Sequence, residues 1–224
     1  MVVKLRSLLF LLTLISSMAV NADSVILTET AYQQSAEHEN NINSLSAFLQ
    51  EYSYEIQQDT SRIEFRVDSP VGEVRARFQN FNGRFEMLDR GEHDSAAIVD
   101  INVDSLDTDA GFISMMLKSE SFFDVENFPS MRFVGSSFEW FGPRHAVLKG
   151  DLTIQDVTRQ VAFYVELADV EADNKYSQRI TVKATTTIKR SRFGMYTLLP
   201  VVSDDVNLYM SIDALKQDVA LSML

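Results

Sequence analysis

The stretch Arg62–Phe78, RIEFRVDSPVGEVRARF, contains the residue period that decides the fold. Ile63, Phe65 and Val67 alternate with charged residues, and the same alternation returns at the end of the stretch, from Val74 to Phe78. A period of two places successive side chains on opposite faces of a strand. The stretch therefore predicts antiparallel strands with one buried face and one solvated face.

The same alternation recurs along the rest of the chain. It is found in five further rows: Ala97–Val103, Leu148–Ile154, Val161–Leu167, Ile180–Ile188 and Val206–Ile212. Seven or more such strands with little helix between them are typical of an all-β sandwich or a closed barrel. We expect the barrel, because closure removes exposed sheet edges and because a sandwich would not need the helix described next.

One convincing helix is predicted inside this domain, at Asp107–Ser119, DTDAGFISMMLKS. It opens with capping residues and places apolar side chains on adjacent turns. Residues 23–52 form a polar leader that ends in an amphipathic helix, which either docks on the domain or contacts a partner. The period becomes helical again after the last strand row, so residues 215–224 are expected to form a short C-terminal helix.

The N-terminus has the pattern of a secretory signal. Lys4 and Arg6 precede the apolar run Leu8–Ile15, and Val20-Asn21-Ala22 supplies small residues for cleavage after Ala22. The alternative is a membrane anchor, but the run is too short to span a bilayer. We therefore expect residues 1–22 to be a signal peptide and the mature protein to reside in the periplasm.

Composition excludes several classes of function. The chain has no cysteine, which excludes disulfides, thiol catalysis and cysteine-ligated metal. Its formal charge is −12, and loss of Lys4 and Arg6 with the signal peptide would make it −14. Such a surface repels phosphate backbones, so no nucleic-acid partner is expected.

Motifs for catalysis are missing from the sequence. The three histidines, His38, His93 and His145, are far apart and lack ligand spacing. No serine lies in a nucleophile-elbow pattern, and no glycine-rich phosphate loop is found. We expect no catalytic residue, no metal site and no cofactor, and therefore a protein that is not an enzyme.

Five motifs in sequence order resemble the YceI-like family of exported lipocalin-like proteins. They are FQNFNGRF (Phe78–Phe85), SLDTD (Ser105–Asp109), LKSESFFDVENFPSMRF (Leu117–Phe133), LKGDLTIQDVTRQV (Leu148–Val161) and RSRFGM (Arg190–Met195). The resemblance runs from about Tyr54 to Ala214, within the predicted domain, residues 53–214. It implies an eight-stranded antiparallel barrel with one internal helix, and an apolar cavity that holds a polyisoprenoid or an isoprenoid quinone.

The sequence departs from the family pattern on the helix. Where many members carry a polar Arg-Asp-x-His-Leu, this chain has Ile113, Ser114, Met115, Met116 and Leu117. Any headgroup contact made by those polar groups would be absent here. The two methionines instead supply adaptable apolar side chains.

The resemblance turns the aromatic residues into candidates for a ligand site. The expected apolar cavity residues are Phe65, Phe78, Phe85, Phe112, Met115, Met116, Phe122, Phe123, Phe128, Phe133, Leu152, Phe163, Phe193 and Met195. Arg190 and Arg192 are candidates to meet an anionic headgroup, because guanidinium groups suit phosphate. The alternative for these two arginines is a salt bridge on the acidic surface.

Two functions remain open from the sequence. The first is a binding protein for an isoprenoid-type amphiphile, with transient contact to an inner-membrane protein and homodimerisation as further expectations. The second is a periplasmic interaction or stress-response module, in which the rings fill a solid core and the terminal helices carry the function.

Overall fold

The computed structural model describes residues 53–86, 97–174 and 177–217. The predicted signal peptide, residues 1–22, and the predicted leader, residues 23–52, lie outside these ranges. No helix within them has the length and apolarity needed to cross a membrane.

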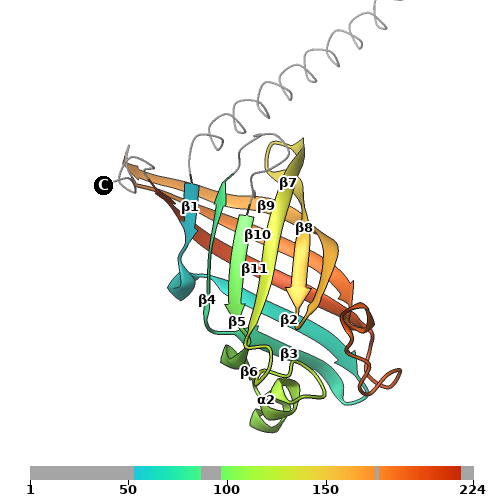
Figure 1. The fold of residues 1–224 in the computed structure, drawn as a ribbon. Helices are drawn as coiled ribbons and strands as arrows, with labels where there is room; N and C mark the ends of the chain where they lie inside the picture. Colours follow the sequence, from blue (N-terminus) through green and yellow to red (C-terminus); the bar gives the residue numbers. More distant parts are fainter. Residues whose placement is uncertain (1–52, 87–96, 175–176, 218–224) are drawn as a thin grey trace, which may run out of the picture. The chain divides into compact units, whose positions relative to one another are not determined.

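Eight antiparallel strands close into a ring (Figure 1). In order around the ring they are β1 (Ser53–Ile56), β4 (Phe81–Glu86), β5 (Ala97–Asn102), β7 (Ser130–Gly142), β8 (His145–Ile154), β9 (Val157–Asn174), β10 (Ser177–Lys189) and β11 (Asp205–Gln217). Pairing of β1 with β11, from Ser53↔Gln217 to Ile56↔Ala214, completes the circle. The predicted all-β, eight-stranded barrel is confirmed.

Three pairs of consecutive strands in the barrel wall are each separated by a short irregular segment, which we call a break. The 3₁₀ turn η1 (Gln58–Thr60) separates β1 from β2 (Arg62–Ser69), and residues 79–80 separate β3 (Gly72–Phe78) from β4. The 3₁₀ turn η2 (Val103–Ser105) separates β5 from β6 (Leu106–Thr108).

Beyond these breaks the barrel is no longer closed by strand pairing. There β11 pairs with β2, β2 with β3 and β3 with β6, and the sheet ends at β6. We call the ring of eight strands the closed half, and we call β2, β3 and β6 with the elements packed on them the split half.

The predicted internal helix is present but shorter than expected. Helix α2 (Gly111–Lys118) contacts β6 and lies at the lower end of the molecule in Figure 1. Asp107 and Thr108 belong to β6 instead, and the N-cap residue is Ala110, which makes no side-chain cap. The prediction of capping side chains was therefore wrong, because pairing of β6 with β3 recruits those residues into the sheet.

The predicted C-terminal helix is wrong at its start. Residues 215–217 continue strand β11, and Leu215 pairs with Glu55 of β1 and with Arg179 of β10. The remaining residues, 218–224, lie outside the described ranges. The helical spacing there is local, whereas strand pairing extends to the end of β11, with β10 as far as Leu215 and with β1 from Ala214 to Gln217.

The closed half depends on close approach of neighbouring strands. Gly150 of β8 lies opposite Gly135 of β7. A methyl group at Gly150 would collide with the Val134 carbonyl and with the ring of Phe133. Absence of side chains at this pair therefore lets the two antiparallel strands pair closely, with the Phe133 ring packed beside them.

Candidate functional site: an apolar cavity inside the barrel

A cavity of about 560 Å³ lies inside the barrel. It extends from closed-half residues such as Phe85 and Ala184 to split-half residues such as Val71 and Phe112. Among its described lining residues only Glu64, Ser69 and Arg190 carry polar side chains. Its volume is within the range of about 300–1,000 Å³ that small-molecule pockets occupy.

The cavity reaches the surface at the split half. Four of its lining residues are largely exposed: Val71 by 92%, Phe112 by 73%, Val201 by 63% and Leu198 by 49%. They come from the β2–β3 turn, from α2 and from the loop that follows the 3₁₀ turn η3 (Arg190–Phe193). These three segments therefore surround the opening.

Aromatic rings from the segment after α2 close the gap between β6 and the remaining strands. The ring of Phe123 lies 5.8 Å from that of Phe65 and 6.1 Å from that of Phe78, measured between centroids. The carbonyl of Phe122 accepts a hydrogen bond of 2.7 Å from the side chain of Gln155 in the β8–β9 turn. The segment thus joins the two sides of the split by side-chain contacts, in place of a strand pair.

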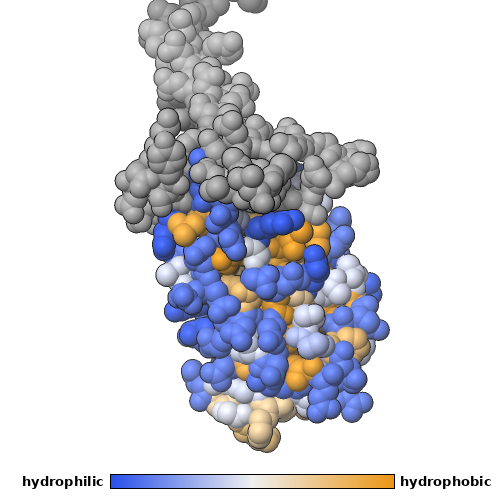
Figure 2. Space-filling model, turned by 60° about the vertical axis from the view of Figure 1, so that its left-hand side comes forward, coloured by the Kyte–Doolittle hydropathy of each residue, from blue (hydrophilic) through white to orange (hydrophobic). Residues whose placement is uncertain are grey.

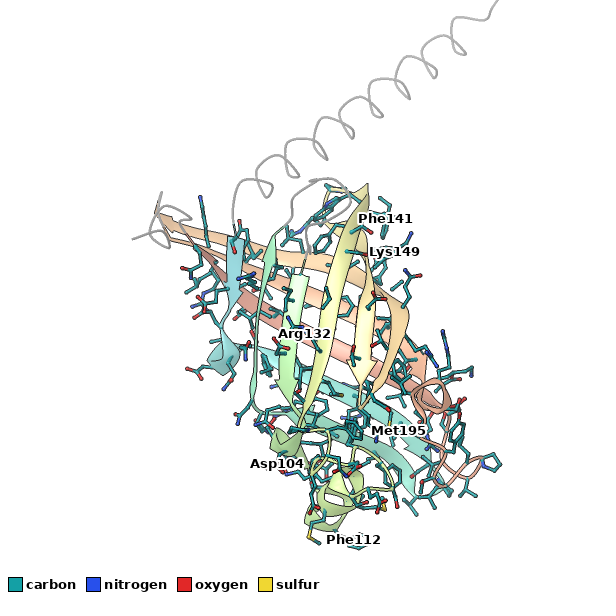
Figure 3. The ribbon with its side chains drawn as sticks, viewed as in Figure 1. Asp104, Phe112, Arg132, Phe141, Lys149 and Met195 are labelled. Carbon is teal, nitrogen blue, oxygen red and sulfur yellow. The ribbon has the colours of Figure 1, made fainter. Side chains whose placement is uncertain are left out.

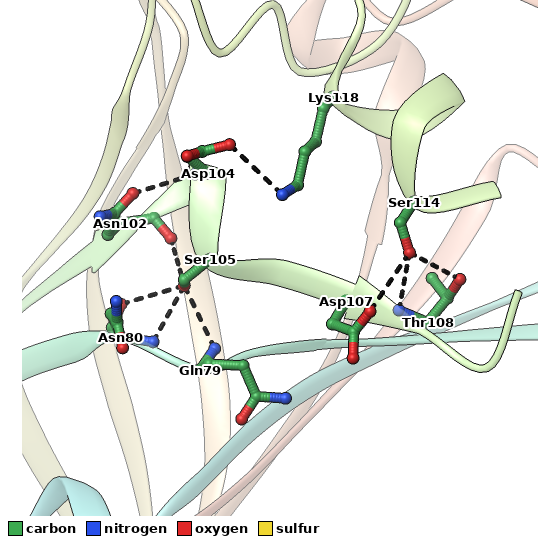
Figure 4. Close-up of polar contacts among 9 residues, drawn as sticks. All are labelled: Gln79, Asn80, Asn102, Asp104, Ser105, Asp107, Thr108, Ser114 and Lys118. Carbon is green, nitrogen blue, oxygen red and sulfur yellow. Dashed lines mark hydrogen bonds and ion pairs between the residues drawn. The ribbon is translucent and has the colours of Figure 1, made fainter. Parts of the chain in front are cut away.

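A single polar side chain, Ser105, links two of the three breaks, residues 79–80 and η2 (Figure 4). The Ser105 hydroxyl accepts hydrogen bonds from the backbone N–H groups of Gln79 (3.1 Å) and Asn80 (2.9 Å). It lies 2.6 Å from the Asn102 carbonyl, to which it donates. One serine therefore holds the bend between β3 and β4 against η2.

A second polar group positions α2 at the end of the cavity (Figure 4). The buried Ser114 hydroxyl accepts a hydrogen bond of 2.9 Å from the Thr108 backbone N–H. At the other end of the helix, Lys118 forms an ion pair of 3.3 Å with Asp104. The apolar face of α2, including Ile113 and Met116, is thereby directed at the cavity.

Arg190 organises the loop on the opposite side of the opening. Its side chain is 4% exposed, and it donates four hydrogen bonds of 2.7–3.1 Å to backbone carbonyls. The acceptors are Met195, Thr197, Val202 and Ser203. Burial lowers the pKa of this guanidinium from its ordinary value.

Both headgroup predictions therefore need correction. Four of the five N–H groups of Arg190 are used within the protein, so the guanidinium serves the loop rather than an anionic headgroup. It is not a surface salt bridge either. Arg192 is exposed and does not line the cavity, but borders a separate hollow between β9 and β10.

The polar lining residues have partners within the protein. The Glu64 carboxylate accepts a hydrogen bond of 2.6 Å from Arg66, and the Ser69 hydroxyl donates one of 2.7 Å to the Gly72 carbonyl. Together with Arg190, these are all the polar side chains that the described lining contains. The described interior therefore presents mainly hydrocarbon surface.

Most of the predicted cavity residues come together in the structure. Eleven of the fourteen line the cavity: Phe65, Phe78, Phe85, Phe112, Met116, Phe122, Phe123, Phe133, Leu152, Phe163 and Met195. Met115 does not, because it points outward from α2 and is 68% exposed. Phe128 is half-buried outside the cavity, and Phe193 is buried beside the β9–β10 hollow.

The predicted set omitted the aliphatic walls and the loop at the opening. The walls include Ile101, Leu148, Val165, Ala184 and Ile212. Their signal was already present in the alternating rows, because these five residues are buried members of those rows. The loop residues Leu198, Val201 and Val202 gave no periodic signal, because they lie in irregular backbone that Arg190 holds.

The fold and the cavity together define a closed antiparallel β-barrel with an apolar interior. The YceI-like domain model matches residues 54–214, and the chain belongs to this family. A UPF0312 protein of Photorhabdus laumondii is 26% identical over 177 residues, which are 79% of this chain and 92% of that protein. A UPF0312 protein of Pectobacterium atrosepticum is 27% identical over 77% of this chain and 90% of that one.

Solved structures share the fold at low sequence identity. BcnA of Burkholderia cenocepacia has a TM-score of 0.58 and 21% identity, with coverage of 70% of this chain and 98% of BcnA. A polyisoprenoid-binding domain from Saccharophagus degradans has a TM-score of 0.54 and 14% identity, with coverage of 73% and 98%. These similarities concern the fold.

Proposed function

We propose that this protein binds a long-chain isoprenoid lipid or isoprenoid quinone in the barrel and carries or sequesters it in the periplasm. The observation that carries the proposal is the apolar cavity, whose described polar side chains are all engaged within the protein. The polyisoprenoid-binding domain of similar fold supports the choice of ligand class. The N-terminal signal pattern supports export.

The proposed mechanism is binding without chemistry. A prenyl chain that leaves water for the cavity gains about 0.8 kcal/mol per buried CH₂ before ordering costs are subtracted. Since the lining offers no unengaged polar side chain, the headgroup stays at the opening in the split half. No paired acid and base is found on the described lining, which supports a binding role over a catalytic one.

Native mass spectrometry of the purified protein, with identification of the lipid released on denaturation, tests the proposal. We expect one discrete bound mass that matches a long-chain isoprenoid. Ala184→Phe, which fills space in the cavity, should remove it. Ala162→Phe, the same change on an exposed position of β9, should keep it. A bare protein that takes up no such lipid would refute the proposal.

A further inference from the structure

Exposed hydrophobic side chains gather at one end of the described barrel. Eight large hydrophobic residues are strongly exposed in the described ranges, and six of them lie on the three segments around the cavity opening: Val71, Phe112, Met115, Tyr196, Leu198 and Val201. The other two are Phe141 and Tyr164, whose rings lie 5.6 Å apart. Figure 3 shows Phe112 and Phe141 at opposite ends of the barrel.

The same three segments contain long uncharged stretches, and α2 carries its charged residue, Lys118, only at its last position. These stretches are Ser69–Gly72 (SPVG), Gly111–Leu117 (GFISMML) and Tyr196–Val202 (YTLLPVV), which we call the rim. Charged residues make up 23% of the chain, yet none occurs in the rim. Figure 2 shows hydrophilic atoms over most of the visible barrel surface with hydrophobic patches between them, and weakly hydrophobic atoms at the end where α2 lies. The rim therefore differs from the wall in both exposure and charge.

The rim is continuous with the cavity, and two of its segments are held in place by side-chain hydrogen bonds. Val71, Phe112, Leu198 and Val201 belong to the rim and also line the cavity. The helix is anchored through Ser114 to Thr108, and the loop is anchored by the four bonds of Arg190. Apolar side chains are thus presented to solvent by anchored segments, at a cost in free energy that burial against an apolar phase would recover.

We propose that the rim docks on the surface of a zwitterionic lipid bilayer and inserts its apolar tips among the lipid chains. The exposed apolar side chains lie on three separate segments of the rim. A fluid bilayer can adapt to such an arrangement, whereas a protein partner would need a surface of matching shape. Tyr196 has the ring and hydroxyl that suit a membrane–water interface. The formal charge of −12 opposes anionic lipid, which selects a neutral surface.

Docking would give the cavity direct access to the lipid phase. The opening lies between the inserted tips, so an apolar cargo passes between bilayer and barrel without crossing water. This part of the inference rests on the proposed function. The docking itself depends on the rim alone.

A fluorescent label placed on the rim tests the docking. The chain has no native cysteine, so Met115→Cys gives one labelling site on an exposed rim residue that does not line the cavity. With phosphatidylcholine vesicles, an environment-sensitive NBD label there should shift to the blue. The same label at Phe141→Cys should not respond. Because the readout is local, attachment of the chain through residues outside the barrel would not imitate it.

A variant with charges inserted in the rim provides a second test of the docking. Phe112→Glu combined with Val201→Glu should weaken vesicle partitioning of the labelled protein about ten-fold or more, because two apolar tips are replaced by carboxylates. Phe141→Glu is the matched control and should leave partitioning unchanged. Thermal unfolding of each variant shows whether the barrel remains folded.

Several outcomes would overturn the docking. They are a rim label that ignores vesicles, a label response equal at both ends, and a shift that follows protein concentration without lipid, which would indicate self-association. Binding of lipid in the cavity is measured separately, as a bound mass in native mass spectrometry. A protein with bound lipid and no vesicle contact refutes docking only, and a protein with vesicle contact and no bound lipid refutes the proposed function only.

Discussion

The closed and split halves of the barrel are built from consecutive strands of the same chain, but they are held together by different interactions. In the closed half every strand has two hydrogen-bonded neighbours, and β1 joins β11 to complete the ring. In the split half the sheet ends at β6, and the gap is closed by Phe123, Gln155 and α2. Backbone pairing therefore sets the width of the cavity, whereas side chains set its opening.

This difference predicts which half of the barrel undergoes local opening at the lower free energy. Opening the closed half requires the loss of many backbone hydrogen bonds, but opening the split half requires only the displacement of packed rings and one loop. Local openings of low free energy are therefore expected at the split half. The following variants test that distinction, in order of decreasing expected effect.

Phe123→Ala should have the largest effect. The ring is buried and packs on Phe65 and Phe78, so its loss should lower the free energy of unfolding by about 4 kcal/mol in urea titrations. Hydrogen exchange should rise in residues 119–129 more than in β8. Phe128→Ala, at a half-buried position outside the cavity, should cost about 1 kcal/mol. Equal losses for the two variants would contradict the closing role of Phe123.

Arg190→Met should cost about 3 kcal/mol, because it leaves several backbone carbonyls of the opening loop without a charged donor. Chemical denaturation measures the loss, and hydrogen exchange should accelerate in residues 195–203. Arg192→Met, two residues away on an exposed position, is the control and should change stability by less than about 0.5 kcal/mol. If both variants behaved alike, Arg190 would not be the anchor of the loop.

Gly150→Ala tests the closed half. The added methyl group meets the Val134 carbonyl and the Phe133 ring, so we expect a loss of about 2 kcal/mol. Because the strain lies in the ring, unfolding should remain a single transition, and exchange in the opening loop should keep its wild-type pattern. Gly111→Ala, where an added methyl meets nothing within 4 Å, should be neutral or slightly stabilising. Selective loosening of the opening by Gly150→Ala would break the distinction between the halves.

Asp204→Asn should have the smallest effect, about 1 kcal/mol, and it should depend on pH. Hydrogen bonds from the Ser191 N–H and hydroxyl, both 2.8 Å, hold the pKa of this carboxyl below its ordinary value of 3.8. Because the pKa of this carboxyl is lower in the folded state, its ionised form stabilises the fold at pH values above the unfolded-state pKa. This contribution is lost as the pH falls through the folded-state pKa. The difference between wild type and variant should therefore be constant near neutrality and shrink below about pH 4.

The neighbouring carboxyl provides the control for this pH dependence. Asp205 is exposed and forms a surface ion pair of 2.8 Å with Lys189. Asp205→Asn should therefore change stability by less than about 0.5 kcal/mol. A pH-independent loss in Asp204→Asn would show that the amide fails for steric reasons rather than through its charge.

The walls of the barrel could be predicted from the sequence because their signal is local. Alternation of apolar and polar residues fixes which side of each strand faces inward, and the rows at Ile63–Val67 and Val161–Leu167 do face the cavity or core. The helix was also predictable, but which of its faces docks was not. Met115 and Met116 are sequence neighbours about 100° apart on the helix, and only the position of α2 decides that Met116 lines the cavity.

The rest depends on contacts between distant residues. Arg190 has the guanidinium group expected of a headgroup-binding residue. In the structure, however, this group donates its hydrogen bonds to backbone carbonyls within residues 195–203. The end of β11 had a helical period, yet pairing with β1 keeps it extended. In both cases a partner elsewhere in the chain outweighed the local pattern, and no local pattern reports such a partner.

The three breaks at η1, at residues 79–80 and at η2 have a consequence for insertions and deletions. In a continuous strand one added residue turns every later side chain to the opposite face, so the closed half tolerates little change in length. At a break the irregular backbone absorbs the added residue, and the alternation on each side is kept. A barrel of this design can therefore lengthen or shorten its open end while its ring stays the same.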